Sequence, residues 1–159
     1  MPGRSLDGAR PELLTAEAAL RAVVAQEHPG LLWQIADYGG MRNEEYTKTI
    51  LQDRVNDWAV AIRHDPSLPK RTTMERWRKI APFGHSMHNY GAAFDVEVIG
   101  TQRGISGLQA LNILKDYAPV VGLIDGRDFG DPPHFELPGG LDAAKAAWEK
   151  QTGTKIFTA

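Results

Sequence analysis

Apolar side chains recur every three or four positions in four stretches of the chain, which is the spacing of one helix face. The pattern predicts helices over residues 11–26, 44–64, 105–118 and 140–150. Pro11 suits the first turn of the first helix, because its missing N–H has no helical partner there. Asn43 has the side chain of an N-cap for the second helix, and acidic residues follow it.

Short apolar or alternating segments between the helices predict β-strands. They cover residues 31–38, 92–98, 119–124 and 133–137. The last three are close in sequence, and strands and helices do not alternate strictly along the chain. This order favours an α+β fold, with one small antiparallel sheet flanked by helices, over a doubly wound parallel sheet.

The alternation in two of these strands places polar side chains on one face of the sheet. Phe94 and Val96 point into the core, so Asp95 points the opposite way. In residues 133–137, His134 and Glu136 share a face in the same manner. A carboxylate and an imidazole on a strand face are not needed for a stable core, so both are candidates for chemistry.

The composition bounds the class of protein. A length of 159 residues with 42% apolar residues suits one domain with a real core. We expect that domain over residues 11–150, between a flexible N-terminal arm at 1–10 and a loose tail at 151–159. No apolar run is long enough for a membrane span, and the N-terminal segment lacks the apolar stretch of a secretory signal. The chain is therefore expected to be made in the cytoplasm.

Charge and cysteine content narrow the chemistry further. The chain has no cysteine, so disulfides, thiolate metal sites and a cysteine nucleophile are excluded. A net charge of −2 argues against a nucleic-acid partner. Residues 70–79 form one local basic run, either a solvated face or a contact for an anionic polymer. This run lies in the long proline-containing excursion expected over residues 66–84.

Two histidines lie close to glycine or proline and near the starts of predicted strands. His88 lies seven residues before Asp95, and Gly91 between them permits a tight turn that folds His88 back over the strand. His134 would add a third ligand from the polar face of another strand. Two imidazoles and a carboxylate, with one position open for water, is a catalytic zinc arrangement. Such a set also suits other divalent ions, and each histidine taken singly also fits a hydrogen-bonded turn.

The motifs around these residues resemble those of a known peptidase family. "SMHNYGAAFD" (86–95) is similar to the S-x-H-x-x-G-x-A-x-D signature of zinc D-Ala-D-Ala carboxypeptidases and L-alanyl-D-glutamate endopeptidases. "DPPHFE" (131–136) is similar to the second signature of that family. The arginine of "YGGMRNEEY" sits where that family has its strand, glycine and arginine segment, and the lead-in "RSLDGARPELL" resembles that of the phage endolysin branch. The resemblance covers about residues 5–140 and implies a Hedgehog/DD-peptidase-like fold.

The resemblance implies roles for individual residues. His88, Asp95 and His134 match the zinc ligands, and Asp131 matches the catalytic acid/base. The two prolines after Asp131 would stiffen the backbone and hold its carboxylate near the metal. A carboxylate that caps its own loop is the alternative for Asp131.

Four further residues take supporting positions. Arg42 matches the arginine that stabilises an oxyanion or grips substrate, although a structural ion pair would also explain it. Ser86 matches the signature serine beside the site, with a supporting substrate-binding role. Glu136 either orients His134 or faces solvent. His85 adjoins the motif at the rim of the site and matches no ligand position.

One segment departs from the family pattern. Where relatives carry an aromatic and glycine-rich stretch, this chain has "GLIDGRDFGDPPHFEL" (122–137). Asp125 and Arg127 replace the aromatic element, so the substrate groove is expected to differ. Asp125 and Asp128 are also rivals for the role of Asp131.

These features lead to two functional hypotheses. The first is a monomeric zinc peptidase of phage or prophage origin that cuts the stem peptide of peptidoglycan. L-Ala–D-Glu cleavage is favoured over D-Ala–D-Ala cleavage because of the lead-in and the aspartate in "DPPH". The enzyme would reach the cell wall by holin release or within a virion. The second is a non-catalytic, zinc-containing structural or wall-binding module of a phage particle.

Overall fold

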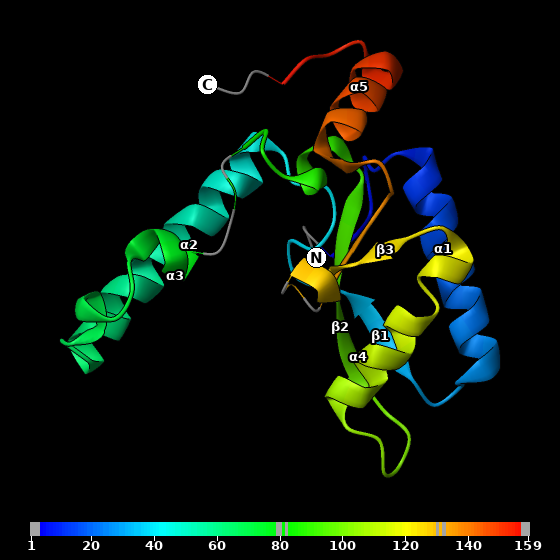
Figure 1. Ribbon diagram of the computed structural model, residues 1–159, viewed down its shortest axis with the longest axis horizontal. Coiled ribbons are helices and arrows are strands. Elements are labelled where there is room, and N and C mark those ends of the chain that lie inside the picture. Colours follow the sequence, from blue (N-terminus) through cyan, green and yellow to red (C-terminus); the bar gives the residue numbers. More distant parts are fainter. Residues whose placement is uncertain (1–3, 79–80, 82, 130, 132, 157–159) are drawn as a thin grey trace.

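A four-stranded antiparallel sheet organises the chain in the computed structural model, which describes residues 4–78, 81, 83–129, 131 and 133–156 (Figure 1). The strands pair in the order β1-β2-β4-β3. Their bounds are Leu32–Ile35 (β1), Ala93–Gly100 (β2), Ile124–Asp125 (β3) and His134–Glu136 (β4). The expected α+β class with a small antiparallel sheet is confirmed.

Helices surround this sheet. The α-helices are α1 (Pro11–Glu27), α2 (Glu44–His64), α3 (Met74–Arg78), α4 (Gly107–Asp116) and α5 (Gly140–Thr152). Short 3-10 helices lie at Leu68–Lys70 (η1), Met87–Tyr90 (η2), Pro119–Val121 (η3) and Gly126–Phe129 (η4). Pro11 occupies the first turn of α1, and the Asn43 side chain accepts a hydrogen bond from the Tyr46 amide at the start of α2. Both expected helix starts are therefore confirmed.

The core lies against one face of the sheet. Leu13 and Leu20 of α1 are fully buried, together with Phe94 of β2 and Phe135 of β4, whose rings stack. Leu114 of α4 is also buried in this core. Because apolar and polar residues alternate along β2 and β4, the opposite face of the same strands carries the polar side chains.

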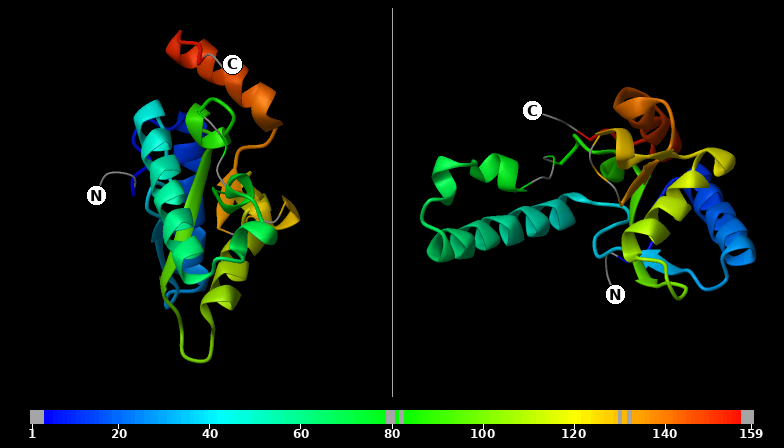
Figure 2. Two further views of the ribbon diagram at one scale, coloured as in Figure 1. Left: turned by 90° about the vertical axis from the view of Figure 1, so that its left-hand side faces the viewer. Right: turned by 60° about the horizontal axis from the view of Figure 1, so that its bottom comes forward.

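The second helix leaves this core and projects to one side (Figures 1 and 2). Thr47 is the only buried residue of α2, and α3 folds back along it, with the rings of Trp58 and Trp77 5.8 Å apart. The excursion expected over residues 66–84 thus contains η1 and α3 rather than loop alone. We call residues 44–78 the α2–α3 arm.

Two strand predictions need correction. Residues 119–124 are not a buried strand: η3 occupies 119–121, Val120 is 73% exposed, and only Ile124 belongs to β3. Pro119 starts a helical turn there, and Gly122 ends it with a φ of 81°. The strand predicted over 31–38 ends at Ile35, because the chain turns at Tyr38, where φ is 53°.

Residues 4–10, the described part of the arm predicted over residues 1–10, contact the domain. Leu6 joins the buried core, and Arg4 forms an ion pair of 2.7 Å with Glu97. The amide of Arg10 donates to the carbonyl of Gly91. Among the described residues, no helix has the length and apolar character needed to cross a bilayer.

Gly91 is the tightest point in this packing. It ends η2 with a φ of 62°, and a Cβ built there would lie 2.9 Å from the Arg10 amide nitrogen. Both the backbone conformation and the close approach therefore require glycine. The turn that results directs η2, and with it His88, back toward β2.

We expect Gly91→Ala to lower the free energy of unfolding by about 2–4 kcal/mol, because backbone strain and overlap with Arg10 add together. Gly104→Ala is the matched control, since Gly104 has a φ of 86° and no atom within 4 Å of its would-be Cβ. That control should cost about 1 kcal/mol. Urea unfolding monitored by tryptophan fluorescence measures both values. Equal losses would show that the Arg10 contact adds nothing.

Candidate metal centre

His88 is held in one tautomer by the backbone. It lies on η2, whose start is capped by the Ser86 hydroxyl, which accepts from the His88 amide at 3.3 Å. The imidazole is buried, and its Nδ1 lies 3.0 Å from the carbonyl oxygen of Gly40. Because a carbonyl oxygen only accepts, Nδ1 carries the proton and Nε2 keeps its lone pair. Burial also lowers the pKa of His88, which favours this neutral form.

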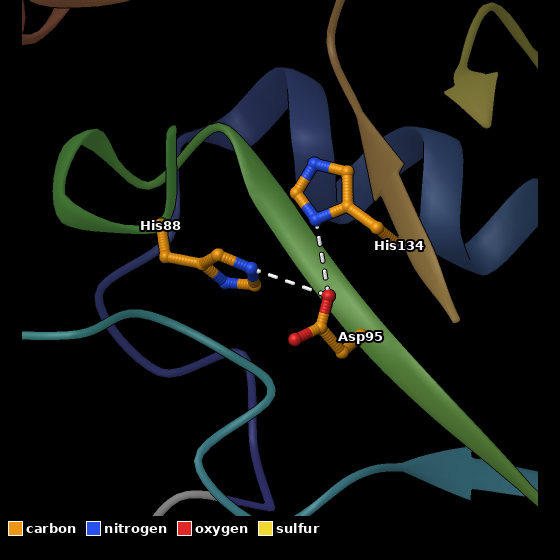
Figure 3. Close-up of side chains that lie close together, drawn as sticks. All are labelled: His88, Asp95 and His134. Carbon is orange, nitrogen blue, oxygen red and sulfur yellow. Dashed lines mark hydrogen bonds and ion pairs between the residues drawn. The ribbon is translucent and has the colours of Figure 1, made fainter. Parts of the chain in front are cut away.

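Asp95 stands at the centre of the cluster (Figure 3). Its Oδ1 lies 3.3 Å from His88 Nε2 and 3.0 Å from His134 Nδ1. Its Oδ2 accepts a hydrogen bond of 2.9 Å from Arg42 Nη2. Burial alone would raise the pKa of Asp95, but the hydrogen bond from His134, the adjacent His88 ring and the charge of Arg42 hold it well below its usual range. The carboxylate is therefore ionised.

His134 approaches from the neighbouring strand. Residues 95 and 134 face each other in the β2–β4 register, and the His134 side chain is 9% exposed. Its Nε2 lies 3.4 Å from Glu136 Oε1. Of the two alternatives for Glu136, the structure therefore favours the one in which it orients the ring of His134. Burial lowers the pKa of His134, but hydrogen bonds with Asp95 and Glu136 outweigh it and raise the pKa to about 9.

The three side chains fit a divalent cation. One ligand atom from each of His88, Asp95 and His134 lies within 4.8 Å of the others. Ligands at zinc–nitrogen and zinc–oxygen distances of about 2.0–2.1 Å in a tetrahedron stand about 3.3 Å apart. The two separations from Asp95 Oδ1, 3.0 and 3.3 Å, agree with that spacing. Each histidine also has an outer partner, Gly40 or Glu136, that directs the other ring nitrogen inward.

Arg42 supports this cluster from the segment after β1. Its Nε donates to the Tyr38 carbonyl at 2.8 Å, while Nη2 binds Asp95. Burial lowers the pKa of Arg42. The guanidinium forms an ion pair with Asp95, as the structural alternative for Arg42 predicted. Its side chain also lines a cavity beside the cluster, described below.

Asn89 is a residue of the site that sequence reasoning missed. It is buried, its Oδ1 accepts from the amides of Gly84 and Ser86, and its Nδ2 donates to the Arg42 carbonyl at 2.9 Å. One side chain thus connects the histidine turn to the arginine segment. The spacing Ser86-x-x-Asn89 is a capping-box pattern, and that signal could have identified it.

Asp131 lies at the edge of the cluster. Its Oδ2 is 3.8 Å from His134 Nδ1, and the side chain is 52% exposed. Its rival Asp125 is engaged elsewhere, in an ion pair of 3.0 Å with Arg127. The side chain of Asp128 lies outside the described part of the chain. Asp131 is thus a carboxylate beside the cluster with one side open to solvent.

The other residues near the motif have packing or surface positions. Tyr90 is 1% exposed and donates its hydroxyl proton to the Gly84 carbonyl, and Phe94 is fully buried. Both are packing residues. His85 is exposed, in agreement with a position at the rim.

A cavity of about 330 Å³ adjoins the cluster on the side of Arg42. It lies between the sheet and α2. Its lining residues are Asp37, Tyr38, Arg42, Ile50, Asp53, Arg54, Asp57 and Asp95. The base of the α2–α3 arm therefore forms one wall of a space that opens next to Asp95.

Solved structures that resemble this chain include VanYB and LdcB, although no protein-family model and no curated protein matches it. VanYB in complex with D-alanine-D-alanine is 21% identical over 89% of this chain and 75% of VanYB, with a TM-score of 0.52. The LdcB LD-carboxypeptidase, whose structure concerns peptidoglycan recognition, is 19% identical over 98% of this chain and 77% of LdcB, with a TM-score of 0.53. The chain shares its fold with both. At these identities the likeness establishes the fold, and it confirms the DD-peptidase-like architecture.

The pKa of His134 has a consequence for cation binding. At pH 7 a group with a pKa of about 9 is protonated, whereas His88 is neutral and Asp95 ionised. Binding of a divalent cation must therefore displace about one proton, from His134. We expect apparent affinity for zinc to rise about tenfold per pH unit below pH 9 and to level off above it.

Calorimetric titration of the metal-free protein with zinc, in buffers of different ionisation enthalpy, counts the protons released. His85→Ala should leave the count unchanged. Release of no proton at pH 7, or of two, would contradict the protonation states assigned to the cluster.

Proposed function

We propose that this chain is a zinc-dependent peptidase that hydrolyses the stem peptide of bacterial peptidoglycan. The observation that carries the proposal is the convergence of His88, Asp95 and His134 from η2, β2 and β4 on one point. The shared fold supports the substrate class, since VanYB binds D-alanine-D-alanine and LdcB is an LD-carboxypeptidase. When bound, zinc supplies Lewis-acid activation of a peptide carbonyl and of water.

Asp131 is the residue we assign to proton transfer. Its carboxylate lies 3.8 Å from the ring of a proposed ligand, and its exposed side can reach a water at the cluster. There it would accept the proton of the attacking water and deliver it to the leaving amine. Prolines follow Asp131 in the sequence and restrict the backbone next to it.

Arg42 and Ser86 complete the proposed site. Arg42 cannot lose its charge, and it lines the cavity together with Asp95, where it would stabilise the oxyanion on the substrate carbonyl. Ser86 supports His88 through its hydroxyl, which accepts a hydrogen bond from the His88 amide. Contact of Ser86 with substrate stays a prediction.

The cavity beside Arg42 offers room for the peptide. A space of about 330 Å³ is within the range of small-ligand sites. We propose that the stem peptide enters between the sheet and α2, with the scissile carbonyl next to Asp95. The endolysin-like lead-in and the aspartate at 131 favour cleavage between L-Ala and D-Glu, in a phage or prophage lysin, over removal of a terminal D-Ala.

We expect Asp131→Asn to reduce kcat/KM for wall-peptide hydrolysis by about 10²–10⁴-fold, because the amide cannot take up a proton. Zinc stoichiometry should stay at the wild-type value, since Asp131 is not among the ligands. Mass spectrometry of digested muropeptides measures the rate and reports which bond is cut. His85→Ala, at an exposed neighbouring position, is the control and should retain activity.

The alternative is a zinc-containing structural or wall-binding module without turnover. It predicts that wild-type protein loads zinc and binds wall material, yet releases no fragment from any peptidoglycan chemotype. That result would overturn the peptidase proposal, whereas loss of cleavage in Asp131→Asn with full zinc content would support it.

A further inference from the structure

A fully buried lysine lies beneath the loop that carries Asp131. Lys115, in the last turn of α4, is 0% exposed, and its ammonium makes no hydrogen bond among the described residues. Its Nζ lies 3.7 Å from Asp125 Oδ1 and 5.2 Å from the centre of the Phe135 ring. A buried ammonium without a hydrogen bond is costly, so the retention of Lys115 beside apolar core residues calls for a physical reason.

The two groups that Lys115 contacts are opposite each other in the sheet. Asp125 of β3 and Phe135 of β4 are partners in the antiparallel register. The segment between them leaves one strand and returns to the other, so this pair closes a loop. Lys115 therefore attracts the carboxylate on one side of the closing pair and lies over the ring on the other side.

Asp125 is also held from the solvent side. Its Oδ1 accepts from the Arg127 amide at 2.9 Å and from Arg127 Nε at 3.0 Å, and Oδ2 accepts from Nη2 at 3.0 Å. Arg127 Nη1 in turn binds Asp116 of α4 at 3.1 Å. The carboxylate thus connects the start of the loop to α4 by an exposed and a buried cation.

The next residue transmits this position to Asp131. The Gly126 carbonyl accepts from the Asp131 amide at 2.9 Å, and the Asp131 carbonyl accepts from the His134 amide at 3.1 Å. A Cβ at Gly126 would overlap the Asp131 carbonyl oxygen and lie 2.9 Å from His134 Cβ. The backbone of residue 126 thus packs directly against the residues at 131 and 134.

We infer that Lys115, Asp125 and Arg127 form a clamp that positions Asp131 beside the metal cluster. The three are positioning residues, because they act on Asp131 through Gly126 and do not reach the cluster themselves. Half of the Asp131 side chain is exposed, with its Oδ2 3.8 Å from His134 Nδ1, so we assign its positioning to the backbone contacts of residue 131 with Gly126 and His134. The inference rests on the proposed function for its catalytic consequence, while its structural part stands alone.

The clamp also explains the departure of residues 122–137 from the family pattern. Asp125 and Arg127, the two residues that set this segment apart from the motif it resembles, both fix the loop. Lys115 is the third residue of the clamp. Its sequence position did not single it out, because a lysine in the last turn is typical of an amphipathic helix.

The test uses the metal-free full chain with Lys115→Met, which keeps the length of the side chain and removes its charge. Amide hydrogen exchange is followed by NMR at Asp131 and His134, whose amides donate to Gly126 and Asp131. We expect exchange at these two amides to accelerate about tenfold or more, with Leu20 and Val24 of α1 unchanged. Lys48→Met, which removes an exposed lysine paired with Glu44 at 3.2 Å, is the control and should change neither.

Arg127→Gln keeps the test decisive if Lys115→Met fails to fold, because Arg127 is 40% exposed and its loss leaves the core intact. It should accelerate the same two amides. Exchange that stays at the wild-type rate in Arg127→Gln, or that rises equally in α1, would overturn the inference.

Kinetics separates this inference from the proposed function. For stem-peptide hydrolysis, Arg127→Gln should lower kcat about tenfold with KM and zinc content unchanged, because substrate and metal contacts are retained. If the wild-type protein cleaves no wall peptide, the proposed function fails, and the exchange rates still decide whether the clamp exists.

Discussion

The ionised carboxylate of Asp95, shielded from water on the polar face of β2, is the constraint on which the rest of the site depends. A buried carboxylate is stable only when cations and hydrogen-bond donors surround it. Here one oxygen is between two imidazoles and the other is bound to a guanidinium. Each of these partners comes from a different element, so the need to neutralise one charge brings η2, β4 and the segment after β1 together.

This arrangement also accounts for the backbone around the site. The amide of Asp95 donates to the Gly39 carbonyl and the Gly40 carbonyl accepts from His88, so two adjacent glycines contact both sides of the cluster. Each glycine is closely packed: a Cβ on Gly39 would lie 2.6 Å from the Asp95 carbonyl oxygen. Without a metal ion, the positive charge of protonated His134 offsets the negative charge of Asp95. A divalent cation would replace that proton. The site can therefore keep one geometry in both states.

Local patterns in the sequence were sufficient for the parts of the site that depend on strand alternation and helix caps. The period of two in 92–98 and 133–137 placed Asp95, His134 and Glu136 on one face, and the structure has them there. Asn43 and Pro11 likewise marked helix starts correctly.

Long-range contacts were not available from such patterns. Arg42 pairs with Asp95, and Asn89 bonds to Arg42, across long separations in the sequence. The burial of Lys115 depends on the elements that pack against its helix. The failure at 119–124 has a local cause, since an apolar run is equally compatible with a 3-10 turn when proline starts it and glycine ends it.

The central claim is that His88, Asp95 and His134 bind one cation together. X-ray absorption at the zinc edge of the zinc-loaded protein tests it most directly. The account predicts a four-coordinate ion with two imidazole ligands, and nitrogen and oxygen atoms at about 2.0–2.1 Å. A shell of oxygen atoms alone, without the outer scattering of imidazole rings, would contradict it.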